Sequence, residues 1–370
     1  MSQLFTPLQV GPLKLANRII IAPMCQYMAD EGLATDWHTI HLGQMALSGA
    51  GLLIIEATAV EAVGRITHGC VGLYSDAHEA ALKKVIDSVR KYSTMPIMIQ
   101  LGHAGRKASS YRPWEGGQLQ TPADGGWEVG GPSAIPQLPN EAAPKAYELA
   151  DLKRIRQAFV DAAKRSVRIG FDGIELHSAH GYLLHQFLSP IANQRTDEYG
   201  GSLENRMRFP LEVFKAVREV TPANVCLGLR ISGTDWVEGG WTAEDSIVFG
   251  RAIKALGCDF IDVSSGGVSP KQQITLGPKY QVPLATQIKK GTGMLTMAVG
   301  LITEPQEAED IIVNGEADMV ALARGMLYDP RWPWHAAAQL GAQVQVAKPY
   351  WRSQPRGLST LFGDIKTGGR

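Results

Sequence analysis

His177, His180 and Tyr182 lie within one short segment of the chain. The segment follows an apolar run, residues 173–176, which predicts a strand that ends where the first imidazole begins. Binding and catalytic groups are frequent in such loops. Two imidazole N–H groups can hold one carbonyl oxygen, and a nearby phenol can supply a proton. The segment therefore suggests activation of a carbonyl-bearing substrate, whereas a surface pair or a metal-ligand pair of histidines would have the same spacing.

Short apolar runs alternate with helical patterns along nearly the whole chain. The runs are apolar on both faces, as expected for parallel strands covered by helices. Eight strand-then-helix units predict a (β/α)₈ barrel forming a single domain, residues 1–370, with a doubly wound open sheet as the alternative. The predicted strands are 18–22, 52–56, 96–101, 173–176, 225–230, 260–264, 295–299 and 319–323. The predicted helices include 76–92, 151–169, 203–220, 243–256 and 304–313, with Asp76, Thr242 and Thr303 as caps.

The composition fits a protein of a reducing cytosol and does not favour a nucleic acid or a membrane as a partner. The chain has 370 residues, of which 45% are hydrophobic, enough for a sizeable core. Its 36 basic and 36 acidic residues give a formal net charge of +0, which does not favour nucleic acid or an anionic membrane as a partner. No apolar run is long enough to span a bilayer, and the first residues lack a signal-peptide pattern. The four cysteines are widely separated, which argues against a disulfide framework or a structural zinc.

One long segment, residues 102–149, interrupts the repeat after the third predicted strand. It is rich in glycine and proline and carries Tyr111, Trp114 and Trp127. Long segments of this kind in compact domains are usually lids or binding loops. We therefore expect it to cover the C-terminal mouth of the barrel.

Polar residues stand at the ends of two central strands. Active sites of barrels are built at these C-terminal ends. Arg230 ends an otherwise apolar strand, so it needs a partner, either an internal carboxylate such as Glu175 or the N1/O2 edge of a flavin. Gln100 offers both a donor and an acceptor to a pyrimidine-type edge.

The last two strands end in residues suited to an anion. Gly300, Arg324 and Gly325 lie where barrels often bind phosphate, after strands seven and eight. Glycine lets backbone N–H groups approach the anion, and arginine adds a fork of charged donors. A glycine helix cap and a surface ion pair would use the same residues. The chain has no dinucleotide fingerprint and no P-loop, and a flavin mononucleotide, with one phosphate, needs neither.

Several longer motifs together resemble the old yellow enzyme family of flavin-dependent ene-reductases. Within that family the chain is similar to the thermophilic-like branch, near the bacterial xenobiotic reductases and NADPH dehydrogenases. The resemblance covers essentially the whole chain. The motifs that carry it are residues 17–18, 22–27, 100–106, 177–190, 193–206 and 299–300.

The resemblance implies a barrel that holds FMN non-covalently and uses NADPH as the reductant, with NADH as the alternative. It implies ping-pong hydride transfer to the C=C bond of α,β-unsaturated carbonyl or nitro compounds. His177 and His180 match the pair that binds the substrate oxygen, and Tyr182 matches the proton donor. Tyr27 matches a substrate-contacting tyrosine, and Cys25 matches the cysteine that tunes the flavin. The implied cofactor-binding positions are Pro23, Met24, Cys25, Ala57, Gln100, His177, Arg230, Val299, Gly300, Ala323, Arg324 and Gly325.

The same resemblance implies a homodimer or a homotetramer. Residues 341–370 contain Tyr350-Trp351-Arg352, which is similar to the segment that reaches a neighbouring subunit's active site in this branch. Either Trp351 or Arg352 would then border the substrate of that neighbour.

Three other functions remain as alternatives. A flavin-free, phosphate-binding barrel isomerase or aldolase would use the same anion site, although no lysine ends a predicted strand. A metal-dependent hydrolase could use His103, His177 and His180, although no strand end supplies a convincing carboxylate ligand. A non-catalytic binding protein is the third. A yellow colour of the purified protein separates the flavin hypothesis from all three.

Overall fold

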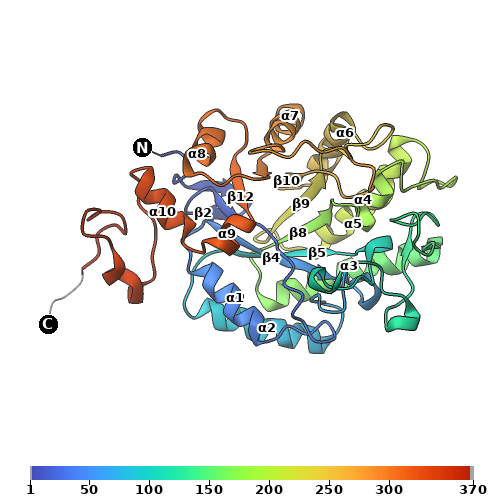
Figure 1. Cartoon of the computed structure of the whole chain (residues 1–370), viewed down its shortest axis with the longest axis horizontal. Coiled ribbons are helices and arrows are strands. Elements are labelled where there is room, and N and C mark those ends of the chain that lie inside the picture. The colour runs from blue at the N-terminus through green and yellow to red at the C-terminus, as the bar shows by residue number, and fades with distance from the viewer. Residues whose placement is uncertain (1, 367–370) are drawn as a thin grey trace.

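Eight parallel strands close into a barrel, and helices surround it (Figure 1). The structure is a computed structural model that describes residues 2–366. The strands follow one another in chain order, and the last pairs with the first. This confirms the (β/α)₈ barrel and rejects the open sheet. The strands are β3 (Ile19–Ile21), β4 (Leu52–Ala59), β5 (Ile97–Gly102), β8 (Gly173–Ser178), β9 (Cys226–Ser232), β10 (Ile261–Ser264), β11 (Thr296–Val299) and β12 (Met319–Leu322).

The five predicted helices are present but differ from the structure at some ends, and the helices at 36–46, 183–188, 282–292, 324–328 and 332–339 were not among the predicted ranges. The cap before α2 is Ser75, whose side chain accepts from the His78 N–H, so Asp76 is the first helical residue rather than the cap. Glu304, not Thr303, precedes α8, whereas Thr242 caps α6 as predicted. The helices are α1 (Asp36–Ala46), α2 (Asp76–Arg90), α3 (Leu149–Ile169), α4 (Leu183–Leu188), α5 (Leu203–Val220), α6 (Ala243–Ala255), α7 (Val282–Thr292), α8 (Pro305–Val313), α9 (Arg324–Tyr328) and α10 (Trp332–Gln339).

The interior of the barrel changes from apolar to charged along the strands. Successive side chains of a strand point to opposite faces. On β8, Ile174 and Leu176 therefore pack outward in the helix-facing core, while Glu175 and His177 alternate with them. The N-terminal half of the interior is apolar, and the hairpin of β1 (Leu8–Val10) and β2 (Leu13–Leu15) contributes to it. The polar residues are thus gathered toward the C-terminal mouth.

The segment after β5 is attached to that mouth. It contains only short elements, among them η2 (Gly105–Lys107), β6 (Gly130–Gly131) and β7 (Lys145–Ala146). The buried guanidinium of Arg106 donates to the Val268 carbonyl, which lies in the loop after β10, at 2.6 Å. It also donates to the Ile135 carbonyl at 3.1 Å. One buried arginine thus ties the interior of the segment to a barrel loop.

The chain beyond α10 extends away from the barrel, in red at the left of Figure 1. This arm contains the 3₁₀ turn η5 (Lys348–Ser353), and its Leu361 and Phe362 pack on Ala337 of α10. Residues 367–370 of the segment predicted to contact a neighbour lie outside the described residues. Between residues 2 and 366, no helix is both long and apolar enough to cross a membrane.

Candidate active site

The two histidines predicted to act together are in contact at the end of β8. His177 Nε2 and His180 Nδ1 are 3.3 Å apart, and the two rings are nearly perpendicular. His177 Nδ1 accepts from the Ala179 N–H at 3.2 Å, so the proton of a neutral His177 lies on Nε2. On the other side, His180 Nε2 lies 2.6 Å from the Ser264 hydroxyl oxygen, at the end of β10. The structure thus brings both imidazoles to one place and adds a serine to them.

Burial sets the charge of these groups. The pKa values of His177 and His180 are held well below the ordinary value, first by burial and then by the positive charge of Arg230. Burial raises the pKa of Tyr182 well above its ordinary value. The Tyr182 ring is perpendicular to that of His177, with centroids 4.9 Å apart. At neutral pH the site therefore holds two neutral imidazoles beside a protonated phenol.

The loop that carries His180 has an unusual backbone that its neighbours hold in place. His180 has a φ of 59°, in the left-handed region that non-glycine residues rarely adopt. Its N–H donates to the Ser232 hydroxyl at 2.9 Å, and its carbonyl accepts from Lys107 Nζ at 2.7 Å. Strain of this kind persists only where the surroundings fix it, and it is common at functional sites.

Lys107 is a site residue that the sequence analysis missed. Besides the His180 carbonyl, its ammonium binds the Gly267 carbonyl at 3.0 Å and lies 4.9 Å from the centre of the Tyr182 ring. Burial lowers the pKa of Lys107 to about 8, and the charge of Arg106 acts in the same direction. The sequence does place Lys107 directly after the Gly102-His103-Ala104-Gly105-Arg106 motif, which could have drawn attention to it. Only the folded chain shows which groups Lys107 contacts.

Arg230 and Gln100 each have an internal carboxyl partner. Arg230 Nε forms an ion pair with Asp262 Oδ2 at 3.0 Å, without the alignment of a hydrogen bond. Gln100 Nε2 donates to Glu175 Oε1 at 2.7 Å. The carboxylate beside Arg230 is therefore Asp262, not Glu175 as the sequence suggested. Because Arg230 also lowers the pKa values of His177 and His180, its charge acts on the mouth as well.

The segment after β3 places Cys25 and Tyr27 beside the same mouth. The pKa of the Cys25 thiol is raised well above its ordinary value, first by its interaction with the Cys70 thiol and then by burial. Burial also raises the pKa of Tyr27, whose ring meets the edge of Trp114, with centroids 5.7 Å apart. Trp114 belongs to the segment 102–149, so this part of the segment contacts the loop after β3. Nothing in the sequence indicated that Cys70 would lie beside Cys25.

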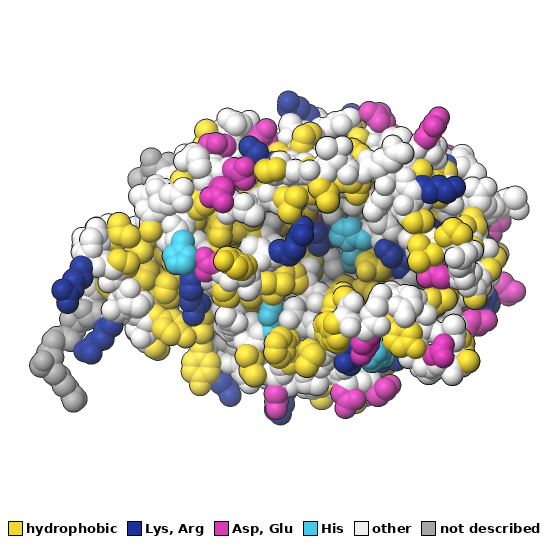
Figure 2. Space-filling model, viewed as in Figure 1, with side chains coloured by type: hydrophobic (Ala, Val, Ile, Leu, Met, Phe, Trp, Pro, Cys, Tyr) yellow, Lys and Arg dark blue, Asp and Glu magenta, His cyan; other side chains and the backbone are white. Residues whose placement is uncertain are grey.

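Ala57 of β4 is also at this mouth. It lines a small cavity together with Cys70, His103, His177 and Tyr182. Pro23 and Met24 precede Cys25 in the same loop after β3. Figure 2 shows histidine, basic and hydrophobic side chains around a recess near the middle of the face that it views.

The residues predicted to hold a phosphate lie where β11 and β12 end. Gly300 has a φ of 125°, and a Cβ there would lie 2.7 Å from Gln281 Nε2, so only glycine fits. Val299 precedes it, and Ala323 caps α9, whose first residues are Arg324 and Gly325. A Cβ on Gly325 would meet nothing within 4 Å. A short helix N-terminus after strand eight, with open space and an exposed arginine, suits a phosphate.

Trp351 and Arg352 do not join these groups within one chain. Both lie in η5 of the arm that extends away from the barrel. The Trp351 indole N–H donates to the Val346 carbonyl, inside the same arm, at 3.0 Å.

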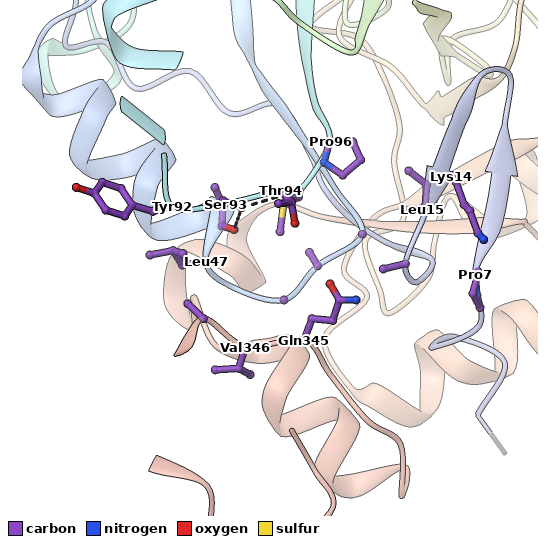
Figure 3. A pocket seen from close by; sticks show the side chains of 17 residues that line it. Pro7, Lys14, Leu15, Leu47, Tyr92, Ser93, Thr94, Pro96, Gln345 and Val346 are labelled. Carbon is purple, nitrogen blue, oxygen red and sulfur yellow. Dashed lines mark hydrogen bonds between the residues drawn. The ribbon is translucent and has the colours of Figure 1, made fainter. Parts of the chain in front are cut away.

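A cavity of about 530 Å³ lies at the other end of the barrel (Figure 3). It is lined by residues that precede β4 and β5, such as Gly51 and Pro96, and by Gln345 and Val346 of the arm. No histidine or carboxylate is among its lining residues. It is therefore separate from the chemistry at the mouth. Within residues 2–366, no three His, Cys, Asp or Glu side chains are grouped so that they could hold a metal ion.

The amino-acid sequence is similar to those of known flavin enzymes. A sequence model of the NADH:flavin oxidoreductase / NADH oxidase family matches residues 3–343. An NADPH dehydrogenase from Geobacillus sp. (strain WCH70) is 42% identical over 95% of this chain and 98% of the relative. An NADPH dehydrogenase from Listeria innocua serovar 6a is 41% identical over 95% of this chain and 99% of the relative.

Solved structures show the same barrel. Morphinone reductase superimposes with a TM-score of 0.76 at 29% identity, over 94% of this chain and 91% of that one. A 2-naphthoyl-CoA reductase superimposes with a TM-score of 0.82 at 27% identity over 92% of this chain, which spans about half (52%) of that longer chain. The chain is thus an NAD(P)H-dependent flavin oxidoreductase, and it belongs to the old yellow enzyme family.

Proposed function

We propose that this enzyme uses FMN to reduce the C=C bond of α,β-unsaturated carbonyl or nitro compounds with NAD(P)H. The observation that carries the proposal is the contact of two neutral imidazoles, 3.3 Å apart, beside a buried and protonated phenol. A metal-dependent hydrolase would need at least a third ligand beside the two histidines, and residues 2–366 contain no such group of three His, Cys, Asp or Glu side chains. An aldolase would need a lysine whose amine is open to substrate. Lys107 instead donates to two backbone carbonyls.

The residues at the mouth fit FMN. Gly300, Arg324 and Gly325 would hold the phosphate, since they combine a left-handed glycine, a helix N-terminus and a guanidinium. Gln100 and Arg230 would face the polar edge of the ring system. When bound, FMN would carry hydride from NAD(P)H to the alkene in two successive half-reactions. The remaining neighbours in the proposed cofactor set are Pro23, Met24, Cys25, Ala57, His177, Val299 and Ala323.

Ser264 would decide which nitrogen of His180 carries the proton. The Ser264 hydroxyl can donate to either of two acceptors, His180 Nε2 at 2.6 Å or Gln281 Oε1 at 3.3 Å. When it donates to the nearer one, His180 Nε2, the proton of neutral His180 lies on Nδ1, next to His177 Nε2–H. The two N–H groups then point to a shared position where one substrate oxygen can accept from both. Donors aimed at an oxygen that gains negative charge stabilise the transition state, each by about 10²–10³ in rate.

Tyr182 would protonate the substrate carbon next to the activating group. Its raised pKa keeps the phenol protonated at neutral pH, and its place beside His177 puts it next to the bound oxygen.

Tyr27 and Trp114 would border the substrate. Trp351 or Arg352 of the partner subunit would complete the site in a homodimer or homotetramer. The four free thiols suit a reducing compartment such as the cytoplasm.

An absorbance spectrum tests the proposal directly. The purified protein should show flavin bands that bleach when NADPH is added without oxygen. The bands should return when 2-cyclohexenone is added, and the product should be cyclohexanone.

Two results would overturn it. A protein that stays colourless after incubation with FMN would contradict the flavin site. Flavin that is reduced by NADPH but not reoxidised by any enone or nitroalkene would contradict the alkene substrate. Denaturing the protein and identifying the released flavin separates FMN from FAD.

A further inference from the structure

A buried group of charged residues adjoins the two histidines inside the barrel. Glu175 and Asp262 are fully buried, and Arg230 is 7% exposed. Gln100 and Glu175 are register partners on β5 and β8, and Arg230 and Asp262 are register partners on β9 and β10. The residue of β9 opposite Glu175 is Gly228, which has no side chain. The group occupies four adjacent strands, with Arg230 opposite His177 and the Phe260 ring against Gly228.

The group contains more acid than base. It has two carboxyls and one guanidinium, so full ionisation would leave an uncompensated negative charge out of contact with water. Asp262 takes the direct ion pair with Arg230, while the hydrogen-bond partner of Glu175 is the neutral amide of Gln100. Among the described residues, neither oxygen of Asp262 has a hydrogen-bond partner, but its Oδ2 forms the ion pair with Arg230; Oε2 of Glu175 has neither a hydrogen bond nor an ion pair. An unpaired buried charge is very costly, so this carboxyl is the member that most readily binds a proton.

The surroundings of Glu175 support this assignment. Burial raises the pKa of Glu175 to about 8, the negative charge of Asp262 raises it further, and the charge of Arg230 opposes both. His177, next along the same face of β8, is neutral, and the Cys258 thiol, the other titratable group that interacts with Glu175, has a raised pKa. Arg230 is therefore the only nearby cation, among the residues described, that stabilises the Glu175 carboxylate.

We propose that Glu175, where it is ionised in the oxidised enzyme, takes up one proton from solvent when the flavin of the proposed function is reduced. The inference rests on that function, because it requires a flavin next to Arg230. Hydride from NAD(P)H brings two electrons and one proton, so bound FMN gains one negative charge. That charge competes with the carboxylates for Arg230, and Glu175 then binds a proton and becomes neutral. Reduction thus takes up two protons per two electrons, one of them at Glu175.

The consequence is a change in how the flavin potential depends on pH. For a two-electron couple, each proton taken up changes the potential by about 30 mV per tenfold change in proton concentration. Below about pH 8, Glu175 is mostly protonated in the oxidised enzyme, and the slope is about 30 mV per pH unit. Above pH 8, the reduced enzyme still binds the extra proton, and the slope doubles to about 60 mV per pH unit.

The test is a spectroelectrochemical titration of the FMN-loaded enzyme between pH 6.5 and 9.5. Glu175→Gln keeps the shape of the side chain but cannot bind the proton, so its slope should stay near 30 mV per pH unit throughout. Asp262→Asn removes the neighbouring negative charge, so the steeper region should begin at a lower pH. Glu309→Gln is the matched control, because Glu309 is also a buried glutamate but binds the N-terminal residues Ser2 and Leu4. Its slope should equal that of the wild type.

The outcomes separate this inference from the function on which it rests. A wild-type slope that is constant over the whole range overturns the inference, even if the enzyme reduces enones normally. A steep region that persists in Glu175→Gln also overturns it, because the second proton would then bind elsewhere. If Glu175→Gln does not retain FMN, the wild-type slope and the Asp262→Asn shift still decide the matter. A wild-type protein that binds no flavin rejects both proposals and is recognised beforehand by its colour.

Discussion

At the scale of single residues, burial assigns opposite tasks to side chains that touch. The same loss of solvent lowers the pKa of His177 and raises that of Tyr182. The imidazole thereby loses its positive charge and becomes a neutral donor, whereas the phenol keeps its proton. A hydrogen-bonding site and a proton donor thus coexist at one pH without any carboxylate between them.

The substitution Tyr182→Phe tests the proton donor. We expect alkene reduction to slow by about 10²–10⁴, because general acid catalysis contributes that much. Reduction of the flavin by NADPH should change little, since that half-reaction needs no proton from the enzyme. Stopped-flow measurements follow the two half-reactions separately. An equal loss in both would remove Tyr182 from this role.

At the scale of elements, the loops after β8 and β10 approach so closely that only glycine fits between them. A Cβ on Gly267, which has a φ of 93°, would lie 2.5 Å from the His180 carbonyl carbon. A Cβ on Gly181 would lie 2.2 Å from the Gly267 carbonyl oxygen. Lys107 joins the two loops through both carbonyls. The position of His180 therefore depends on two loops that are far apart in the sequence.

The substitution Gly267→Ala should disturb this contact. The added methyl group must displace the His180 backbone, and alanine is strained at a positive φ, so we expect a loss of about 1–3 kcal/mol in the free energy of unfolding. Enone turnover should fall more than flavin reduction by NADPH, because the shared oxygen site would be distorted. Urea unfolding and the two half-reactions measure these effects. Gly277→Ala is the control, since a Cβ there meets no atom within 4 Å; similar losses in both variants would contradict the argument.

At the scale of the whole molecule, the barrel forms the site, whereas the arm lies away from it. The barrel brings residues from many strands to one mouth, whereas the arm places Trp351 and Arg352 away from it. The arm is nevertheless ordered by its own contacts: Trp334 of α10 packs against Tyr350 and Phe362, and the Arg331 guanidinium lies over both Trp334 and Tyr350. An ordered arm that leaves its own barrel is consistent with the proposed contact with a second copy.

Subunit mixing tests the role of the arm. Light scattering should show a dimer or a tetramer. Arg352→Ala should raise the KM for the alkene, whereas Arg356→Ala, on the same arm, should not.

Mixed oligomers of Tyr182→Phe and Arg352→Ala chains should recover activity, because a site with an intact Tyr182 would receive Arg352 of the partner subunit. A monomeric enzyme with full activity would contradict this arrangement, and so would mixtures that recover nothing. If Trp351 is the residue that enters the site, the same scheme with Trp351→Ala gives the recovery.

The sequence alone determined the barrel and most of the residues at its mouth. Each strand is a short apolar run, and such runs are visible locally because strands covered on both faces need apolar side chains throughout. β4 and β9 continue past their predicted ends at Glu56 and Arg230, where polar residues enter the strands near the mouth. α1 was not predicted, because its buried face includes His38 and His41 instead of a regular apolar stripe. His177, His180 and Tyr182 could be grouped because they are neighbours in the chain.

Only the tertiary structure decided which distant residues act on that group. His180 is contacted by Ser264 and by Lys107, which come from other strands and loops. Arg230 is contacted by Asp262 of the neighbouring strand. A single serine, lysine or aspartate in a chain of this length carries no signal of its partner, since the contact depends on the register of the closed barrel. The pairing of Arg230 with Asp262, and of Glu175 with Gln100, follows from that register. Burial and the resulting proton affinities follow from it as well, because they depend on what surrounds a side chain and not on its place in the sequence.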